Sequence, residues 1–287
     1  MLTSEMNRAK DSMRGGSPPS ASTLRLFCFP HAGGTAATFN QWRPAVAPDI
    51  ELWPVQLPGH GERWSEPPLA DLRALVATLN SELGRHFGVP FAFVGHSMGA
   101  LIAYELTRLL RKERGPQPLA LYVCGQPAPD LASRVGPLHE LDEPELLEAL
   151  RTLDGTPEEV FGDPELRELV LPILRADLAV CGTYRHAAGE PLDCPISGFL
   201  GSDDPLVLPW EMREWRRHTR ASCGLHVLAG NHFFSAAQQR RLVELLTDDV
   251  QRLFSGGLGV LEFRNFSGDG GAVMAGVGGA ASGGLGS

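Results

Sequence analysis

The sequence has no apolar run near its beginning and no stretch of the about 20 apolar residues that a membrane-spanning helix needs. Residues 1–22 are polar and rich in serine, glycine and proline. They do not resemble a secretory signal, which requires an apolar segment, so we expect a cytoplasmic protein that does not bind membranes. Because these residues bring little apolar bulk to offset the entropy of ordering, we predict that they form a disordered leader.

Cysteine is scarce, and positive charges are fewer than negative ones. The five cysteines are an odd number and include no C-x-x-C pair, which argues against a disulfide framework and a zinc site. The formal net charge is −9, whereas binding to phosphates needs a dense cationic surface. Nucleic acid is therefore not an expected partner, although a local basic patch could still receive an acidic protein. No motif indicates a bound metal ion or cofactor.

The chain instead alternates short apolar segments with helical periodicity, and 43% of its residues are hydrophobic, enough for a sizeable core. Strands separated by helices predict an α/β fold, with a mostly parallel central sheet covered by helices on both faces. The expected strands are 24–29, 50–56, 91–94, 119–124, 196–200 and 225–228, and the principal expected helices are 69–87, 100–111 and 240–254.

The alternation of strands and helices is interrupted at about residues 131–188, between the fourth and fifth expected strands. This stretch has no good strand, and its helical pieces predict a lid over a site at the strand ends. After residue 255 the chain becomes rich in glycine, which loses much entropy on ordering. We therefore predict a folded domain over residues 23–255 and a flexible tail over residues 256–287.

The strongest chemical signal is Gly95-His96-Ser97-Met98-Gly99. This G-x-S-x-G motif follows an apolar strand and precedes a helix, which is the context of a nucleophile elbow. Such a turn raises the serine hydroxyl above the strand ends and places it at a helix N-terminus, which favours negative charge. We therefore predict that Ser97 is a catalytic nucleophile.

A serine nucleophile needs a base and an acid, which should follow it in the order Ser, Asp, His. His232 lies in a loop just after the last expected strand, whereas His226 lies within that strand and His96 beside the nucleophile. We predict that His232 is the base. Asp203 and Asp204 compete as the acid that orients it, and we favour Asp204, whose backbone is restricted to extended conformations by the following proline.

The oxyanion formed during acyl transfer requires two backbone donors. The elbow supplies one, the N–H group of Met98. The other is expected from the loop after an earlier strand. Pro30-His31-Ala32-Gly33-Gly34 follows the first strand, and we predict that its donor is the N–H group of Ala32.

Five motifs together closely resemble the type II thioesterases, the stand-alone α/β-hydrolase thioesterases that accompany polyketide and nonribosomal peptide synthases. The motifs are FCFPHAGG at 27–34, LPGHGER at 57–63, GHSMGA at 95–100, GSDDP at 201–205 and NHFF at 231–234. The resemblance covers about residues 24–254. It departs from the family at Gly230-Asn231, where a glycine pair is usual, and in the glycine-rich extension.

The resemblance implies an α/β-hydrolase fold with a helical lid. The family's catalytic triad falls on Ser97, Asp204 and His232, and its oxyanion donors fall on Ala32 and Met98. The residues that bind the substrate are not identified. Apolar lid residues are candidates for the acyl pocket or for simple packing, namely Leu146, Leu147, Leu150, Val170, Leu171, Leu174 and Leu178.

The resemblance also implies the reaction, which is hydrolysis of acyl thioesters on the 4′-phosphopantetheine arm of acyl or peptidyl carrier proteins. An acyl-serine intermediate would form, and the hydrolysis would clear stalled or misprimed synthases. The arm belongs to the partner, so the enzyme itself needs no cofactor, and a monomer is the default. The alternatives are a medium-chain acyl-carrier-protein hydrolase and a carboxylesterase for oxygen esters. A non-enzymatic binding module is not expected, because every catalytic element is present.

Overall fold

The computed structural model describes residues 24–131, 136–153 and 155–256, so the expected leader and the tail beyond Gly256 lie outside the described residues. The described part contains one six-stranded sheet in the order β2-β1-β3-β4-β5-β6, and all neighbouring strands are parallel. This confirms the predicted parallel α/β architecture. The strands are β1 (Leu24–Phe29), β2 (Ile50–Pro54), β3 (Phe91–His96), β4 (Leu121–Cys124), β5 (Ile196–Gly201) and β6 (Cys223–Leu228).

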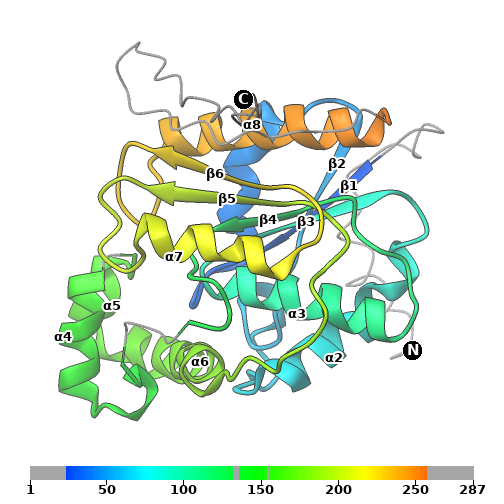
Figure 1. The fold of residues 1–287 in the computed structure, drawn as a ribbon. Helices are drawn as coiled ribbons and strands as arrows, with labels where there is room; N and C mark the ends of the chain where they lie inside the picture. Colours follow the sequence, from blue (N-terminus) through cyan, green and yellow to red (C-terminus); the bar gives the residue numbers. More distant parts are fainter. Residues whose placement is uncertain (1–23, 132–135, 154, 257–287) are drawn as a thin grey trace, which may run out of the picture.

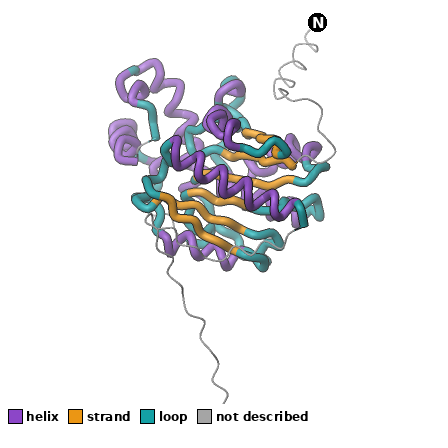
Figure 2. The backbone as a smooth tube through the Cα atoms, turned by 90° about the horizontal axis from the view of Figure 1, so that it is seen from above, coloured by secondary structure: helices purple, strands orange, loops and turns teal. Residues whose placement is uncertain are grey.

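Helices cover both faces of the sheet (Figure 1). One face carries α2 (Leu72–Leu83) and α3 (Met98–Lys112), with the short α7 (Pro209–Arg213) nearby. The other face carries α8 (Ala236–Phe254) and the 3-10 helix η1 (Ala36–Ala45). Figure 2 shows the strands side by side in one twisted layer between these helices.

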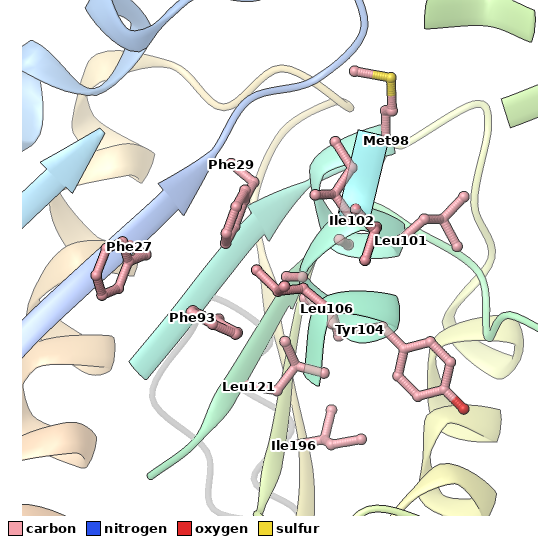
Figure 3. Close-up of a cluster of buried hydrophobic side chains, with 14 of the residues drawn as sticks. Phe27, Phe29, Phe93, Met98, Leu101, Ile102, Tyr104, Leu106, Leu121 and Ile196 are labelled. Carbon is pink, nitrogen blue, oxygen red and sulfur yellow. The ribbon is translucent and has the colours of Figure 1, made fainter. Parts of the chain in front are cut away.

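Alternation along the strands produces the two cores. On β1, Phe27 and Phe29 point to the cluster under α2 and α3, whereas Leu26 and Cys28 point to the cluster under α8. This period of two is the geometry of a strand buried on both faces. Figure 3 shows the two phenylalanines with Phe93 beside the apolar face of α3.

The strand order places a topological switch between β1 and β3. From β1 the chain continues to β2 on one side, and from β3 it continues to β4 on the other side. Loops at the carboxyl ends of two such strands lead away from each other, and the crevice between them is the usual ligand site of an open α/β sheet. Here those loops are the segment 30–34 and the turn at Ser97.

The helical insertion expected between the fourth and fifth strands is present. It comprises α4 (Glu143–Leu153), α5 (Glu158–Gly162) and α6 (Pro164–Thr183), which lie together on the side toward which the arrowheads of β5 and β6 point (Figure 1). The insertion has its own small core of Leu146, Leu150, Phe161, Leu171 and Leu174. Four of the seven apolar residues expected in the lid belong to this core, and two more, Leu147 and Leu178, pack against it. The predicted domain boundaries stay a prediction.

Candidate active site

Ser97 occupies a strained turn between β3 and α3. Its φ of 53° and ψ of −119° lie in a region that non-glycine residues rarely adopt. Two backbone hydrogen bonds hold the turn, because Ser97 N donates to Cys124 O at 2.8 Å and Ala100 N donates to Ser97 O at 2.8 Å. The hydroxyl therefore stands at the N-terminus of α3, where unpaired N–H groups favour a developing negative charge.

Both glycines of the motif are required by close backbone contacts. A Cβ atom on Gly95 would lie 2.1 Å from the carbonyl oxygen of Gly99. A Cβ atom on Gly99 would lie 2.1 Å from the carbonyl oxygen of Phe29, at the end of β1. The G-x-S-x-G pattern is thus explained by the contact of α3 with β3 and β1.

His232 and Asp204 form a buried pair in the loops after β6 and β5. His232 Nδ1 lies 2.8 Å from Asp204 Oδ2, and only 4% and 1% of the two side chains is exposed. The second oxygen, Asp204 Oδ1, accepts hydrogen bonds from the backbone N–H groups of Leu206 at 2.8 Å and Val207 at 3.1 Å. These donors hold the carboxylate in one orientation, and the carboxylate in turn orients the imidazole.

Asp203 lies in a different environment from its neighbour. It is exposed, its carboxylate accepts a hydrogen bond from Ser202 Oγ at 2.9 Å, and its N–H donates to Gly230 O at 2.7 Å. Of the two candidate acids, the structure places Asp204 against His232. Asp203 helps to join the loop after β5 to the loop after β6.

Because Asp204 occupies Nδ1 of His232, Nε2 is the ring nitrogen that would face Ser97 in the predicted triad. The hydrogen bonds of the described residues join His232 Nδ1 to Asp204 and do not join Nε2 to the Ser97 hydroxyl. In many hydrolases this contact tightens only when substrate binds. The His232 ring lies over the backbone of Gly125, where a Cβ atom would be 3.0 Å from the ring carbon Cε1.

Two further histidines surround the pair, and both are kept neutral. Burial, together with the charges of His232 and His31, holds the pKa of His96 well below its ordinary value. Burial also lowers the pKa of His31. His96 Nε2 donates to the backbone carbonyl of His232 at 3.0 Å, so it fixes this loop. The place of His96 beside the nucleophile in the sequence did not predict this contact.

The variant Gly201→Ala tests how closely the loop that carries His232 must approach the end of β5. A Cβ atom at position 201 would lie 2.3 Å from Asn231 O and 2.4 Å from Gly230 O, next to His232. We expect kcat to fall about 10²-fold, because a displacement of about 1 Å in a catalytic group has an effect of that size. The matched control is Gly88→Ala, where nothing lies within 4 Å of the added atom. Steady-state kinetics should show wild-type activity for the control, and equal activity for the two variants would contradict the account.

The loop after β1 lies beside the elbow, as predicted. Ala32 N–H has no acceptor among the described residues, and Met98, the first residue of α3, carries an N–H group that the helix leaves unpaired. Ala32 also packs against both the main core and the small core of the insertion. The loop therefore offers a free donor at the place where the insertion meets the sheet.

Metal-ligating groups and thiols are the remaining side chains of chemical interest in the described residues. No cluster of three or more histidine, cysteine, aspartate or glutamate side chains there is placed to hold a metal ion. All five cysteines are free, and burial raises the pKa of Cys181 and of Cys194 to about 12. Such thiols are not activated nucleophiles. Nor is any described helix both long and apolar enough to cross a bilayer.

The parallel sheet, the strained serine turn and the buried His–Asp pair at neighbouring strand ends define the class of protein, an α/β hydrolase. Residues 24–250 match the thioesterase domain family, and the chain belongs to it. It is a hydrolase that acts on thioesters.

Named relatives agree with this assignment. The chain is 39% identical over 232 residues to the gramicidin S biosynthesis protein GrsT of Aneurinibacillus migulanus, covering 81% of this chain and 91% of GrsT. It is 37% identical over 240 residues to the thioesterase PikA5 of Streptomyces venezuelae, covering 81% and 83%. Among solved structures, the type II thioesterase BorB from the borrelidin biosynthetic cluster is 38% identical with a TM-score of 0.73, covering 81% of this chain and 94% of BorB. The chain thus resembles these proteins over about four fifths of its own length.

Proposed function

We propose that this thioesterase hydrolyses acyl groups from the 4′-phosphopantetheine arm of acyl or peptidyl carrier domains. Its role would be to clear stalled or misprimed groups from a polyketide or nonribosomal peptide synthase. The observation that carries the proposal is the similarity to proteins named for such pathways over about four fifths of the chain. The residues that the chemistry requires stand at the carboxyl ends of the strands in this chain.

In the proposed mechanism, Ser97 Oγ attacks the thioester carbonyl while His232 Nε2 takes its proton. Asp204 holds the imidazole through Nδ1 and stabilises its charged form. The N–H groups of Ala32 and Met98 donate to the oxyanion. When the C–S bond breaks, the thiol of the arm leaves with the proton from His232, and an acyl-Ser97 ester remains. Water then gives its proton to His232 and attacks the ester, which releases the acid and restores Ser97.

We propose that the protein itself requires no metal ion or cofactor for this sequence, because the phosphopantetheine arrives on the carrier. The five free thiols are compatible with a reducing compartment such as the cytoplasm. The insertion would border the acyl chain, since its small core packs against Ala32.

The segment after the Asp204 loop carries Arg213, Arg216, Arg217 and Arg220, and its positive charge makes it a candidate docking face for an acidic carrier. Two of its four arginines are engaged by carboxylates: Arg217 pairs with Asp130 and Glu214, and Arg220 pairs with Glu190 and Asp193. Much of the positive charge there is therefore neutralised within the protein. This favours the alternative that the segment is a solvated helix face.

The substrate class can be tested with one acyl group presented in two forms. We expect kcat/KM for a propionyl-loaded carrier protein to exceed that for the ethyl ester of propionate by at least about 10²-fold, because only the carrier supplies remote binding energy for the reaction. The measurement follows release of propionate by the same enzyme preparation. A preference for the oxygen ester would instead favour a carboxylesterase.

A further inference from the structure

Asp177 is a buried carboxylate on the insertion helix α6, and the mechanism above does not use it. Only 2% of its side chain is exposed. Its Oδ2 atom accepts two hydrogen bonds, one from the backbone N–H of Gly33 at 2.7 Å and one from His60 Nε2 at 2.8 Å. The carboxylate therefore joins α6 to two loops at the sheet edge, the loop after β1 and the loop after β2.

His60 is built to neutralise this carboxylate. Its other ring nitrogen, Nδ1, lies 2.9 Å from Pro58 O, so both nitrogens face acceptors, an arrangement that favours the doubly protonated imidazolium. Burial lowers the pKa of His60, but the hydrogen bond and charge of Asp177 outweigh it, and the net pKa is raised. A buried carboxylate that is paired in this way is stable in one geometry and costly to leave with one partner removed.

The two contacts bear on the orientation of the oxyanion loop. The peptide group between Ala32 and Gly33 is held at both ends: its N–H donates to Asp177, and its carbonyl oxygen accepts from His31 Nδ1 at 3.0 Å. Because Gly33 has a φ of 76°, few other residues could follow Ala32 in this turn. Fixing this peptide plane also restricts the direction of the neighbouring Ala32 N–H.

Apolar packing supports the same connection. A Cβ atom on Gly33 would lie 3.0 Å from Leu174 Cδ1, one turn before Asp177 on α6. The helix therefore contacts the loop through both a carboxylate and a leucine. A shift of α6 would move or release the Gly33 N–H.

We propose that Asp177 is a positioning residue for the oxyanion hole, and that it makes oxyanion stabilisation depend on the docking of helix α6 against the loop after β1. This inference rests on the proposed role of Ala32 as an oxyanion donor. Asp177 does not touch the reacting atoms; it acts through the peptide between Ala32 and Gly33.

The test compares Asp177→Ala and Asp177→Asn with Asp249→Ala. The control removes another buried carboxylate, which accepts from Tyr122 Oη at 3.0 Å on the α8 face of the sheet and does not contact the loop after β1. We expect Asp177→Ala to lower kcat for a small acyl thioester about 10²-fold with little change in KM, since the loss of one oxyanion donor has this order of effect. Asparagine keeps an acceptor oxygen and should restore most of the rate.

The affinity for an acyl trifluoromethyl ketone distinguishes lost oxyanion stabilisation from a general structural effect of the substitution. The adduct of this inhibitor with serine carries an oxyanion. The Ki should rise by the same factor as kcat/KM falls in Asp177→Ala, and stay unchanged in Asp249→Ala. If Asp177→Ala, folded by circular dichroism, keeps kcat and Ki within threefold of wild type, the inference is overturned. If Asp177→Ala does not fold, Asp177→Ser, whose shorter side chain leaves the Gly33 N–H without its acceptor, is measured in its place and is judged by the same threshold.

The rate at which a fluorophosphonate labels Ser97 distinguishes this inference from the proposed function. If wild type labels rapidly but does not hydrolyse carrier thioesters, the substrate assignment fails. In that case slower labelling of Asp177→Ala than of Asp249→Ala would still support the positioning role, and equal labelling would overturn it.

Discussion

Ser97→Ala is expected to lower kcat for a small acyl thioester about 10⁶-fold, the effect of losing the nucleophile in a comparable triad. The loss should fall on kcat rather than on KM, because the removed oxygen forms its bond only during the reaction. Long time courses with the purified variant measure its residual rate. A fluorophosphonate probe should no longer label the protein. The matched control is Ser81→Ala, on the exposed face of α2, which should behave as wild type. A Ser97→Ala variant that retains a tenth of the activity would exclude this serine as the nucleophile.

The same residue should also reveal the strain of the elbow. A non-glycine residue at this φ and ψ costs about 1–3 kcal/mol. Ser97→Gly is therefore expected to be inactive but more stable than Ser97→Ala in urea unfolding. This strain exceeds the roughly 0.4–1 kcal/mol that glycine loses through the unfolded chain, so equal or lower stability of the glycine variant would contradict a strained turn.

Asp204→Asn is expected to lower kcat about 10⁴-fold, the size of effect known when the triad acid becomes an amide. The direction follows from the hydrogen bonds here. Because the Leu206 and Val207 N–H groups require an acceptor, the amide oxygen should face them and the NH₂ group should face His232. His232 Nδ1 must then accept, so its proton moves to Nε2, and Nε2 can no longer take the proton of Ser97.

The control for this variant is its neighbour. Asp203→Asn removes the charge of an exposed residue that contacts Ser202, and we expect kcat within about threefold of wild type. Nitrogen-15 chemical shifts of the His232 ring would show the changed tautomer in Asp204→Asn only. A severe loss in Asp203→Asn with a mild one in Asp204→Asn would reverse the assignment of the acid.

Much of the fold could be predicted because burial imposes local patterns. The apolar strands could be predicted directly from the sequence, whereas the ends of the helices were predicted least accurately. The helix predicted from residue 69 begins at Leu72, because Asp71 caps it by accepting from Ala74 N at 2.8 Å. The helix predicted from residue 240 begins at Ala236, where Gln238 Oε1 accepts a hydrogen bond from the N–H group of the N-cap residue Ser235 at 2.7 Å. Apolar periodicity does not record such polar caps.

The site was predictable where topology brings residues together. The carboxyl ends of parallel strands lie at one edge, so the loops carrying Ser97, Asp204 and His232 were expected to meet there. The structure brings Asp204 and His232 together and joins His96, beside Ser97, to the backbone of His232. Their catalytic roles stay predictions. The contact of Asp177 with His60 could not be predicted, since it depends on how α6 packs across loops more than a hundred residues away. The histidine within the LPGHGER motif was a signal, but the sequence offered no partner for it.

The central claim is that this protein uses Ser97 to remove acyl groups from a carrier. It is tested most directly by the intact mass of an acetyl- or propionyl-loaded carrier protein incubated with wild type or with Ser97→Ala. We predict that wild type returns the carrier to the mass of its free phosphopantetheine form, and that Ser97→Ala leaves it loaded. A carrier that stays loaded with folded, probe-reactive wild type, for these and for longer acyl chains, would contradict the account, as would equal unloading by the two proteins.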